Sequence, residues 1–318
     1  MSGVFLDFAS VSEGGDLDPA PIRATLPDFA IHDATSTAQL HERLAGRSVA
    51  VANKVDFPRE LLAATPTLRL IALTATGVNN VDLTAARELN IAVCNIRNYC
   101  TPSVVQHVFA GLLALTHRLR EYDRALKSGA WEHAEQFTML NFPVRELAGR
   151  TLGIVGYGTL GRGVAEVAKA FGMKVIVANR SGGETAPGRM DLEALLPIVD
   201  VLTLHCPITA ATRNLIGTRE LALMKPDAVL INTARGALVD AQALAQALRA
   251  GRLGGAAIDV LEEEPPLGGN PLLAPDLVNL IVTPHTAWAA RESRQRAIDE
   301  VALNIRDFQA GGRRCRVD

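Results

Sequence analysis

The chain alternates short, continuous runs of Val, Ile and Leu with longer segments in which apolar residues recur at helical spacing. Such runs are typical of parallel strands that helices cover on both faces. The pattern predicts a first series of strands at Val4–Asp7, Val49–Ala52, Leu70–Leu73 and Ile91–Val93. It predicts a second series at Leu152–Val155, Val175–Ala178, Val201–Leu204, Ala228–Ile231, Ala256–Val260 and Leu280–Val282. Two such series indicate an α/β chain with two doubly wound parallel-sheet domains.

Two further helical segments show how these domains follow one another along the chain. One is predicted from about Pro102 to Lys127, between the two series, with Gly129 as its stop. The other, roughly Arg291 to Gln309, follows the second series and has no strands of its own to cover. We therefore expect it to return to the first domain, so that both ends of the chain form one lobe and the middle forms the other. A cleft between two such lobes is where α/β proteins usually bind ligands.

A glycine-rich turn opens the second series. The strand at Leu152–Val155 leads directly into Gly156-Tyr157-Gly158-Thr159-Leu160-Gly161, and a helical pattern then continues to Gly172. Glycines at this spacing allow a tight turn, let backbone N–H groups approach a pyrophosphate and permit close packing of the helix. A GxGxxG motif alone is weak evidence, but between a strand and a helix it predicts a dinucleotide site.

The residues after the next predicted strand select the dinucleotide. A dehydrogenase selective for NAD places Asp or Glu there, where it holds the ribose 2′-hydroxyl. This chain has Asn179, Arg180 and Ser181 instead. A carboxylate would repel the 2′-phosphate of NADP, whereas a guanidinium can bind it through charge-assisted, often bidentate hydrogen bonds. The sequence favours NADP(H); the alternative is a solvated arginine that selects nothing, with NAD(H) as the cofactor.

Three further segments each follow a predicted strand of the second series. They contain Arg235, the acidic run Glu262–Glu264 and His285. We expect them to converge at the carboxyl edge of the sheet, where α/β proteins bind ligands. In the reduction of a 2-keto acid, the arginine would fix the carboxylate and the carbonyl oxygen. The histidine would supply a proton to that oxygen, and the carboxylate would keep the imidazole protonated and oriented. Taken singly, each of these residues would be interpreted as a surface or structural residue. The prediction therefore depends on their occurring together at one edge of the predicted sheet.

Composition and charge narrow the classes of partner. Apolar residues make up 48% of the chain and the formal net charge is −2, which gives no electrostatic bias toward nucleic acid or an anionic membrane. No apolar run approaches the ~20 residues that span a bilayer, and the N-terminus lacks a signal-peptide pattern. The four cysteines include no CxxC pair. We therefore expect reduced thiols, a cytoplasmic protein, no metal site, and no nucleic-acid or membrane partner.

Together these motifs resemble the D-2-hydroxyacid dehydrogenase family over essentially the whole chain, specifically its glycerate dehydrogenase/hydroxypyruvate reductase and glyoxylate reductase branch. Beside the glycine turn and the arginine segment, the resemblance rests on Ala75–Asn80, Arg97–Tyr99, Ser103–His107, His205–Pro207, Asp259–Pro265 and Thr283–His285. It implies a Rossmann cofactor domain over residues 100–286, inserted into a flavodoxin-like substrate domain over residues 1–99 and 287–318. It also implies reduction of a small 2-keto acid, hydroxypyruvate or glyoxylate, to D-glycerate or glycolate, and a homodimer formed mainly through the cofactor domain.

The resemblance also assigns roles to individual residues. Arg235, Glu264 and His285 match the catalytic triad, and Arg235 and His285 also match substrate contacts. The backbone of Thr76, Gly77 and Val78 matches the loop that holds the substrate carboxylate. Asp259 matches the residue that contacts the nicotinamide carboxamide. Cofactor contacts are implied for Thr101, Gly156, Gly158, Thr159, Leu160, Gly161, Asn179, Arg180, Ser181, Cys206, Pro207, Thr212, Thr233, Ala234, Arg235, Asp259 and His285.

Two other functions are compatible with the same residues. The chain would be a glycerate dehydrogenase that prefers NAD(H), or a nucleotide-sensing interaction protein on the same fold. An intact triad does not separate an enzyme from a sensor, because corepressor relatives of this family can retain it. Consumption of NADPH in the presence of hydroxypyruvate does separate them, since a sensor would turn over negligibly.

Overall fold

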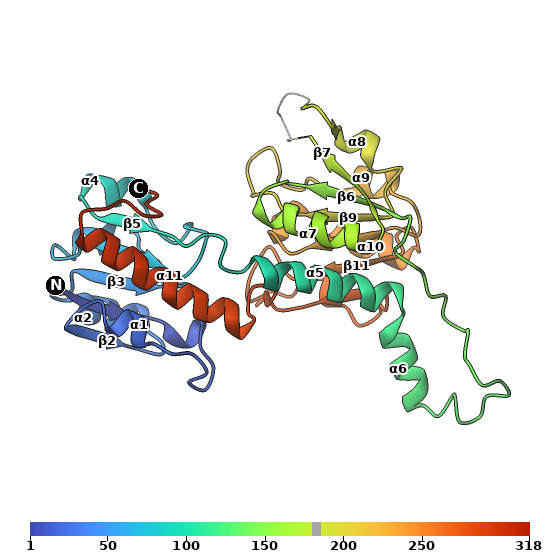
Figure 1. The fold of residues 1–318 in the computed structure, drawn as a ribbon, viewed down its shortest axis with the longest axis horizontal. Coiled ribbons are helices and arrows are strands. Elements are labelled where there is room, and N and C mark those ends of the chain that lie inside the picture. Colours follow the sequence, from blue (N-terminus) through green and yellow to red (C-terminus); the bar gives the residue numbers. More distant parts are fainter. Residues whose placement is uncertain (180–185) are drawn as a thin grey trace. The chain divides into compact units, whose positions relative to one another are not determined.

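The computed structural model of the protein describes residues 1–179 and 186–318. The chain divides into two compact units (Figure 1). Residues 1–100 and 288–318 form the first unit, and residues 101–287 form the second. Each unit has its own parallel sheet and its own hydrophobic core.

The first unit is built on a five-stranded parallel sheet in the order β2-β1-β3-β4-β5, which is the flavodoxin-like doubly wound order. Alternate residues of the strands face opposite sides of the sheet. Val49 and Leu70 join one core with α1 and α11, and Ala50 and Ile71 join the other with α2, α3 and α4. The elements are β1 Ser2–Phe5, α1 Ala20–Arg23, β2 Asp28–Ile31, α2 Leu40–Leu44, β3 Val49–Ala52, α3 Arg59–Ala63, β4 Leu70–Leu73, α4 Leu83–Glu88, β5 Ala92–Cys94 and α11 Arg291–Gln309.

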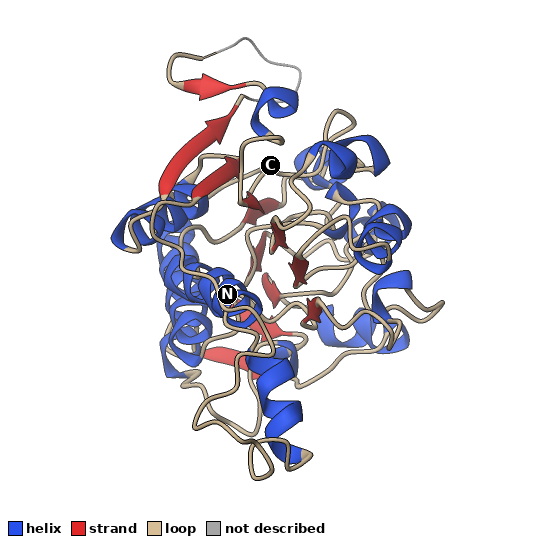
Figure 2. Ribbon diagram, turned by 90° about the vertical axis from the view of Figure 1, so that its right-hand side faces the viewer, coloured by secondary structure: helices blue, strands red, loops and turns tan. Residues whose placement is uncertain are grey.

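The second unit has a seven-stranded parallel sheet in the order β12-β11-β10-β9-β6-β7-β8. This is the dinucleotide-binding order with one strand added at the β12 edge. Ile154 and Val201 pack under α5 and α7, whereas Leu202 and Leu230 face α8, α9 and α10, so helices cover both faces (Figure 2). The elements are α5 Thr101–Thr116, α6 Leu119–Lys127, β6 Thr151–Val155, α7 Thr159–Ala170, β7 Lys174–Ala178, β8 Arg189–Met190, α8 Leu192–Leu195, β9 Val201–Leu204, α9 Thr218–Leu223, β10 Val229–Asn232, α10 Ala241–Arg249, β11 Gly255–Ile258 and β12 Leu280–Val282.

The α/β prediction with two doubly wound parallel sheets is confirmed. The last helix also has its predicted bounds, and it packs against α1 and β4 of the first unit. Because the chain enters the second unit after residue 100 and leaves it before residue 288, both termini belong to the same unit.

Three sequence predictions about secondary structure are wrong. The single helix over 102–127 is interrupted, because Arg118 takes a left-handed conformation (φ 55°) between α5 and α6. Strands β2 and β8 were not predicted; both are edge strands, which are buried less completely and need no continuous apolar run. The first strand is Ser2–Phe5 and not Val4–Asp7. Asp7 lies beyond its end, where the carboxylate accepts hydrogen bonds from the N–H groups of Asn53 and Lys54.

Candidate active site

Three neighbouring strands of the second unit end in the turns that carry the predicted catalytic residues. Strands β10, β11 and β12 run parallel, and β11 pairs with both of the others. Arg235 follows β10, Glu264 follows β11 and His285 follows β12. Because the carboxyl ends of adjacent parallel strands share one edge of the sheet, the fold brings these three turns to the same edge.

The turn after β10 is held by Asn232 and by a close approach of two backbone segments. The fully buried Asn232 side chain accepts from Ala234 N over 3.0 Å and donates to Arg235 O over 2.8 Å. A Cβ at Gly236 would lie 2.0 Å from the carbonyl carbon of Leu261. Only glycine permits this approach, so the Arg235 turn packs directly on the segment that leads to Glu264. Arg235 itself is exposed.

His285 and Glu264 form a hydrogen-bonded pair. His285 Nδ1 lies 2.6 Å from Glu264 Oε2, and Leu261 N donates to Glu264 Oε1 over 2.8 Å. The two side chains are 32% and 33% exposed, so the pair is braced by the protein and still open to a bound molecule. Because Nδ1 faces Glu264, Nε2 is the ring atom available for proton exchange with a substrate.

Asp259 lies at the same edge and is only 2% exposed. Its Oδ1 accepts from Thr283 Oγ1 (2.5 Å) and from Thr286 N (2.8 Å), and its Oδ2 accepts from Ala287 N (2.9 Å). Its backbone oxygen accepts from His285 N over 2.7 Å. The carboxylate therefore braces the segment around His285. Its contact with a nicotinamide carboxamide stays a prediction.

The glycine turn after β6 fits a pyrophosphate. A Cβ at Gly161 would lie 2.2 Å from Gly156 O, and Gly156 has a φ of 94°, so both positions require glycine. A Cβ at Gly158 would point into open space. Helix α7 begins directly after it with Thr159 and Leu160, and no side chain caps the helix start. N–H groups at an uncapped helix N-terminus beside open space suit an anion.

Two hydroxyl groups predicted to contact the cofactor support this fit. Among the described residues, Thr101 Oγ1 and Thr233 Oγ1 are shielded from solvent and have no hydrogen-bond partner. An unpaired buried hydroxyl costs about 1–3 kcal/mol, so a ligand that supplies hydrogen bonds there would remove the penalty. The residues present therefore fit a nicotinamide dinucleotide.

His205 and Cys206 follow β9, next to the glycine turn, where a Cβ at Gly156 would lie 2.5 Å from the His205 carbonyl carbon. Desolvation of the ring lowers the pKa of His205 to about 4, and burial raises the pKa of the Cys206 thiol. Both side chains are therefore uncharged near neutral pH.

Other predicted cofactor residues serve the structure of their own loops. Thr212 Oγ1 donates to Pro207 O over 2.8 Å. Asn179 donates from Nδ2 to Asp191 Oδ1 over 2.6 Å and accepts from Ala186 N over 3.2 Å, so it ties together the two ends of the loop after β7. Arg180 and Ser181 lie outside the described residues.

The predicted substrate loop belongs to the first unit and follows β4. Thr76 Oγ1 donates to Ile96 O over 2.9 Å, and Asn95 Nδ2 donates to Thr76 O over 2.8 Å, so this loop is tied to the chain after β5. Gly77 and Val78 are partly exposed. A loop braced in this way presents its backbone at the carboxyl end of a parallel strand, the edge where such sheets bind ligands.

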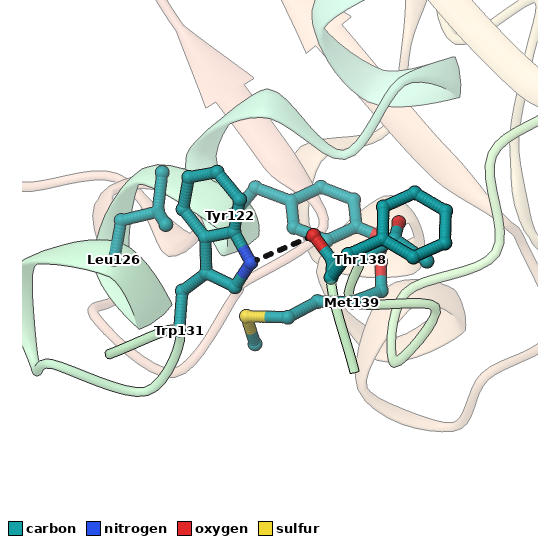
Figure 3. A pocket seen from close by; sticks show the side chains of 6 residues that line it. Tyr122, Leu126, Trp131, Thr138 and Met139 are labelled. Atoms are coloured by element: carbon teal, nitrogen blue, oxygen red, sulfur yellow. Dashed lines mark hydrogen bonds between the residues drawn. The ribbon is translucent and has the colours of Figure 1, made fainter. Parts of the chain in front are cut away.

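Two hollows lie in the described part of the second unit. One, of about 190 Å³, lies between α5 and the ends of β10–β12 and is lined by His107, Thr233, Asp259 and Thr283 among others. The other, of about 250 Å³, lies between α6 and the loop that follows it and is lined by Tyr122, Leu126, Trp131, Phe137, Thr138 and Met139 (Figure 3). Only the first hollow contains predicted site residues.

Within residues 1–179 and 186–318, no helix is long and apolar enough to cross a membrane. The same part of the chain holds no cluster of three or more His, Cys, Asp or Glu side chains arranged to bind a metal ion.

The sequence reasoning gave no role to Asn232, Thr283 or His107, although their side chains bond the turns of the site. Asn232 ends one strand and Thr283 directly follows another, so their positions were a signal. Thr283 and His107 also lie in the segments Thr283–His285 and Ser103–His107, on which the resemblance rests. The contact between these two side chains depends on how α5 lies across the sheet.

Comparison with known proteins identifies relatives over most of the chain. A family model described as "D-isomer specific 2-hydroxyacid dehydrogenase, NAD binding domain" matches residues 109–287. A glycerate dehydrogenase of Methylorubrum extorquens is 43% identical, over 93% of this chain and 95% of that protein. A hydroxypyruvate reductase of Blautia hydrogenotrophica is 34% identical, over 93% of this chain and 94% of that protein. A glyoxylate reductase of Thermococcus litoralis is 40% identical, over 82% of this chain and 79% of that protein.

Solved structures share the fold over almost the entire length. A Thermus thermophilus protein superposes with a TM-score of 0.84 at 34% identity, covering 100% of both chains. An acyclic imino acid reductase in complex with NADPH and D-Arg superposes with a TM-score of 0.85 at 28% identity, covering 99% of this chain and 100% of the other.

Proposed function

This chain belongs to the D-isomer specific 2-hydroxyacid dehydrogenase family, and we propose that it reduces hydroxypyruvate or glyoxylate with NADPH, giving D-glycerate or glycolate. As a member of that family it is an NAD(P)-dependent enzyme. The observation that carries the proposal is the His285–Glu264 pair, braced at the sheet edge beside the Arg235 turn. The relatives named as glycerate dehydrogenase, hydroxypyruvate reductase and glyoxylate reductase support the substrate class.

Each residue has a defined task in this reaction. Arg235 binds the substrate carboxylate and polarises the C2 carbonyl with the two-pronged geometry of its guanidinium. His285 donates the proton on Nε2 to the carbonyl oxygen, and Glu264 holds the opposite ring nitrogen and stabilises the charged ring. When bound, the reduced nicotinamide supplies the hydride that adds to C2. The glycine turn after β6 would hold the dinucleotide through its backbone N–H groups.

Steady-state kinetics with hydroxypyruvate, glyoxylate and pyruvate, each with NADPH and with NADH, test the proposal. We expect the highest kcat/KM for hydroxypyruvate or glyoxylate with NADPH. Turnover with NADH alone would support the glycerate dehydrogenase alternative. Nucleotide binding without turnover of any keto acid would support a nucleotide sensor instead.

We expect Arg180→Ala to lower the ratio of kcat/KM with NADPH to kcat/KM with NADH by about 10- to 100-fold. The reason is that a hydrogen bond to a charged group contributes roughly 1.5–3 kcal/mol, and only NADPH carries the 2′-phosphate. Arg189→Ala is the matched control, because this exposed arginine begins strand β8, nine positions after Arg180 in the sequence. If this ratio of kcat/KM values is unchanged in the Arg180 variant, the assignment of NADPH to Arg180 is wrong. The membership of the family would not be affected.

We also propose a homodimer formed through the second unit. Helix α6 and the loop after it extend away from the sheet of that unit (Figure 1). This segment exposes large apolar side chains, among them Trp131 (54%), Phe137 (89%) and Leu140 (84%). Contiguous exposed apolar surface marks interaction sites. A solution mass of two chains by light scattering, falling to one chain in Phe137→Asp/Leu140→Asp, is the expected result. A wild-type mass of one chain would contradict it.

A further inference from the structure

The Asp259 carboxylate accepts three hydrogen bonds from its own unit. Three donors reach its two oxygens: the N–H groups of Thr286 and Ala287 and the hydroxyl of Thr283. Backbone N–H groups can only donate, so the carboxylate accepts from them. Because both N–H groups directly follow His285, the position of the catalytic loop depends on where Asp259 holds them.

The hydroxyl of Thr283 lies between Asp259 and a histidine of helix α5, His107. It lies 2.5 Å from Asp259 Oδ1 and 3.0 Å from His107 Nε2. An ionised carboxylate cannot donate, so the single hydroxyl proton points to Asp259. The lone pair of the hydroxyl then faces His107, and His107 Nε2 must carry the donated proton. The geometry therefore places a proton on His107 Nε2.

His107 is well placed to hold this arrangement. It lies in the middle of α5, whose Val108 and Leu112 are fixed in the core of the unit. Its ring is 27% exposed, and Nε2 is also 3.6 Å from Asp259 Oδ1. The hollow of about 190 Å³ beside it leaves room for a different side chain at this position.

We propose that His107 and Thr283 are positioning residues for the reaction: His107 Nε2–H orients the Thr283 hydroxyl toward Asp259, and Asp259 holds the loop that carries His285. The inference rests on the proposed role of His285 as the proton donor. Without the Thr283 hydroxyl, Asp259 loses one of its donors. Without His107, the Thr283 hydroxyl loses the partner that orients it. Either change would loosen the loop. Since small misplacement of a catalytic group slows the chemical step, the loss falls on kcat.

The test compares side chains that keep and lose each hydrogen bond. Gln at 107 keeps an N–H donor near the Nε2 position, whereas Met has similar length and cannot donate. Ser at 283 keeps the hydroxyl, whereas Val has the shape of Thr without it. We expect His107→Met and Thr283→Val to lower kcat for hydroxypyruvate about tenfold with KM little changed. His107→Gln and Thr283→Ser should stay close to the wild type, as should Gln106→Met, an exposed neighbour on the same helix.

Two further measurements separate this role from general damage to the fold. The double variant His107→Met/Thr283→Val should lose no more than the worse single variant, because both act through the same hydrogen bonds. Nitrogen NMR of histidine-labelled protein should show His107 protonated at Nε2 in the wild type and a shifted signal in Thr283→Val. Multiplicative losses in the double variant, or equal activity of the Met and Gln variants at 107, would overturn the inference. Absence of keto-acid turnover in the wild type would instead overturn the proposed function.

Discussion

Replacing His285 by alanine is expected to lower kcat for reduction of hydroxypyruvate by about 10²–10⁴-fold, the usual contribution of a positioned general acid. The variant loses the Nε2 proton donor and leaves the Glu264 carboxylate without its ring partner. The loop itself should persist, because Asp259 holds it through the backbone N–H groups of Thr286 and Ala287. Rapid-mixing or steady-state measurement of NADPH consumption at saturating substrate gives the value.

The affinity for NADPH, measured by fluorescence titration, should change little in this variant. His117→Ala is a suitable control, because this histidine is exposed at the end of α5 and lies outside the turns of the site. Turnover by His285→Ala close to the wild-type rate would show that another group supplies the proton.

Replacing Arg235 by lysine is the second substitution that we expect to lower kcat/KM strongly. Lysine keeps the positive charge but lacks the planar fork that binds a carboxylate at two points. Loss of a charge-assisted hydrogen bond costs roughly 1.5–3 kcal/mol, so kcat/KM should fall by about 10- to 100-fold. Measurement with hydroxypyruvate at fixed, saturating NADPH would show whether the loss falls on KM, on kcat or on both.

Arg213→Lys is the matched control for this variant. Arg213 also lies in the second unit, and its Nη1 pairs with Glu262 over 2.5 Å with both side chains more than half exposed. Exposed ion pairs of this kind contribute little, so the control should keep wild-type kinetics. Equal activity of Arg235→Lys and the control would exclude a bidentate role for Arg235.

Much of the fold follows from local sequence. Buried central strands such as Val49–Ala52 and Val201–Leu204 are continuous apolar runs, and their bounds are those predicted. The edge strands β2 and β8 lack that pattern because neighbours pair with them on one side only. The break at Arg118 has neither Gly nor Pro to mark it, since the left-handed residue is an arginine.

In the site, too, the positions that follow strand ends could be predicted, whereas contacts between separate loops could not. Strand ends place Arg235, Glu264 and His285 at one edge, and this follows from the pattern of strands alone; their catalytic roles stay predictions. The Gly236 approach to Leu261 and the bonds of Asp259 depend on how separate loops meet. The Asn179 contacts with Asp191 and Ala186 likewise depend on the path of a loop. No spacing rule in the sequence encodes such contacts.

We propose that hydride and proton are added to the 2-keto acid so that the 2-hydroxy acid formed has D stereochemistry. Complete turnover of hydroxypyruvate with NADPH by the wild-type protein, followed by chiral separation of the product, tests this most directly. We expect D-glycerate to form in an amount equal to the NADPH consumed. Formation of L-glycerate, or no consumption of NADPH or NADH, would contradict it.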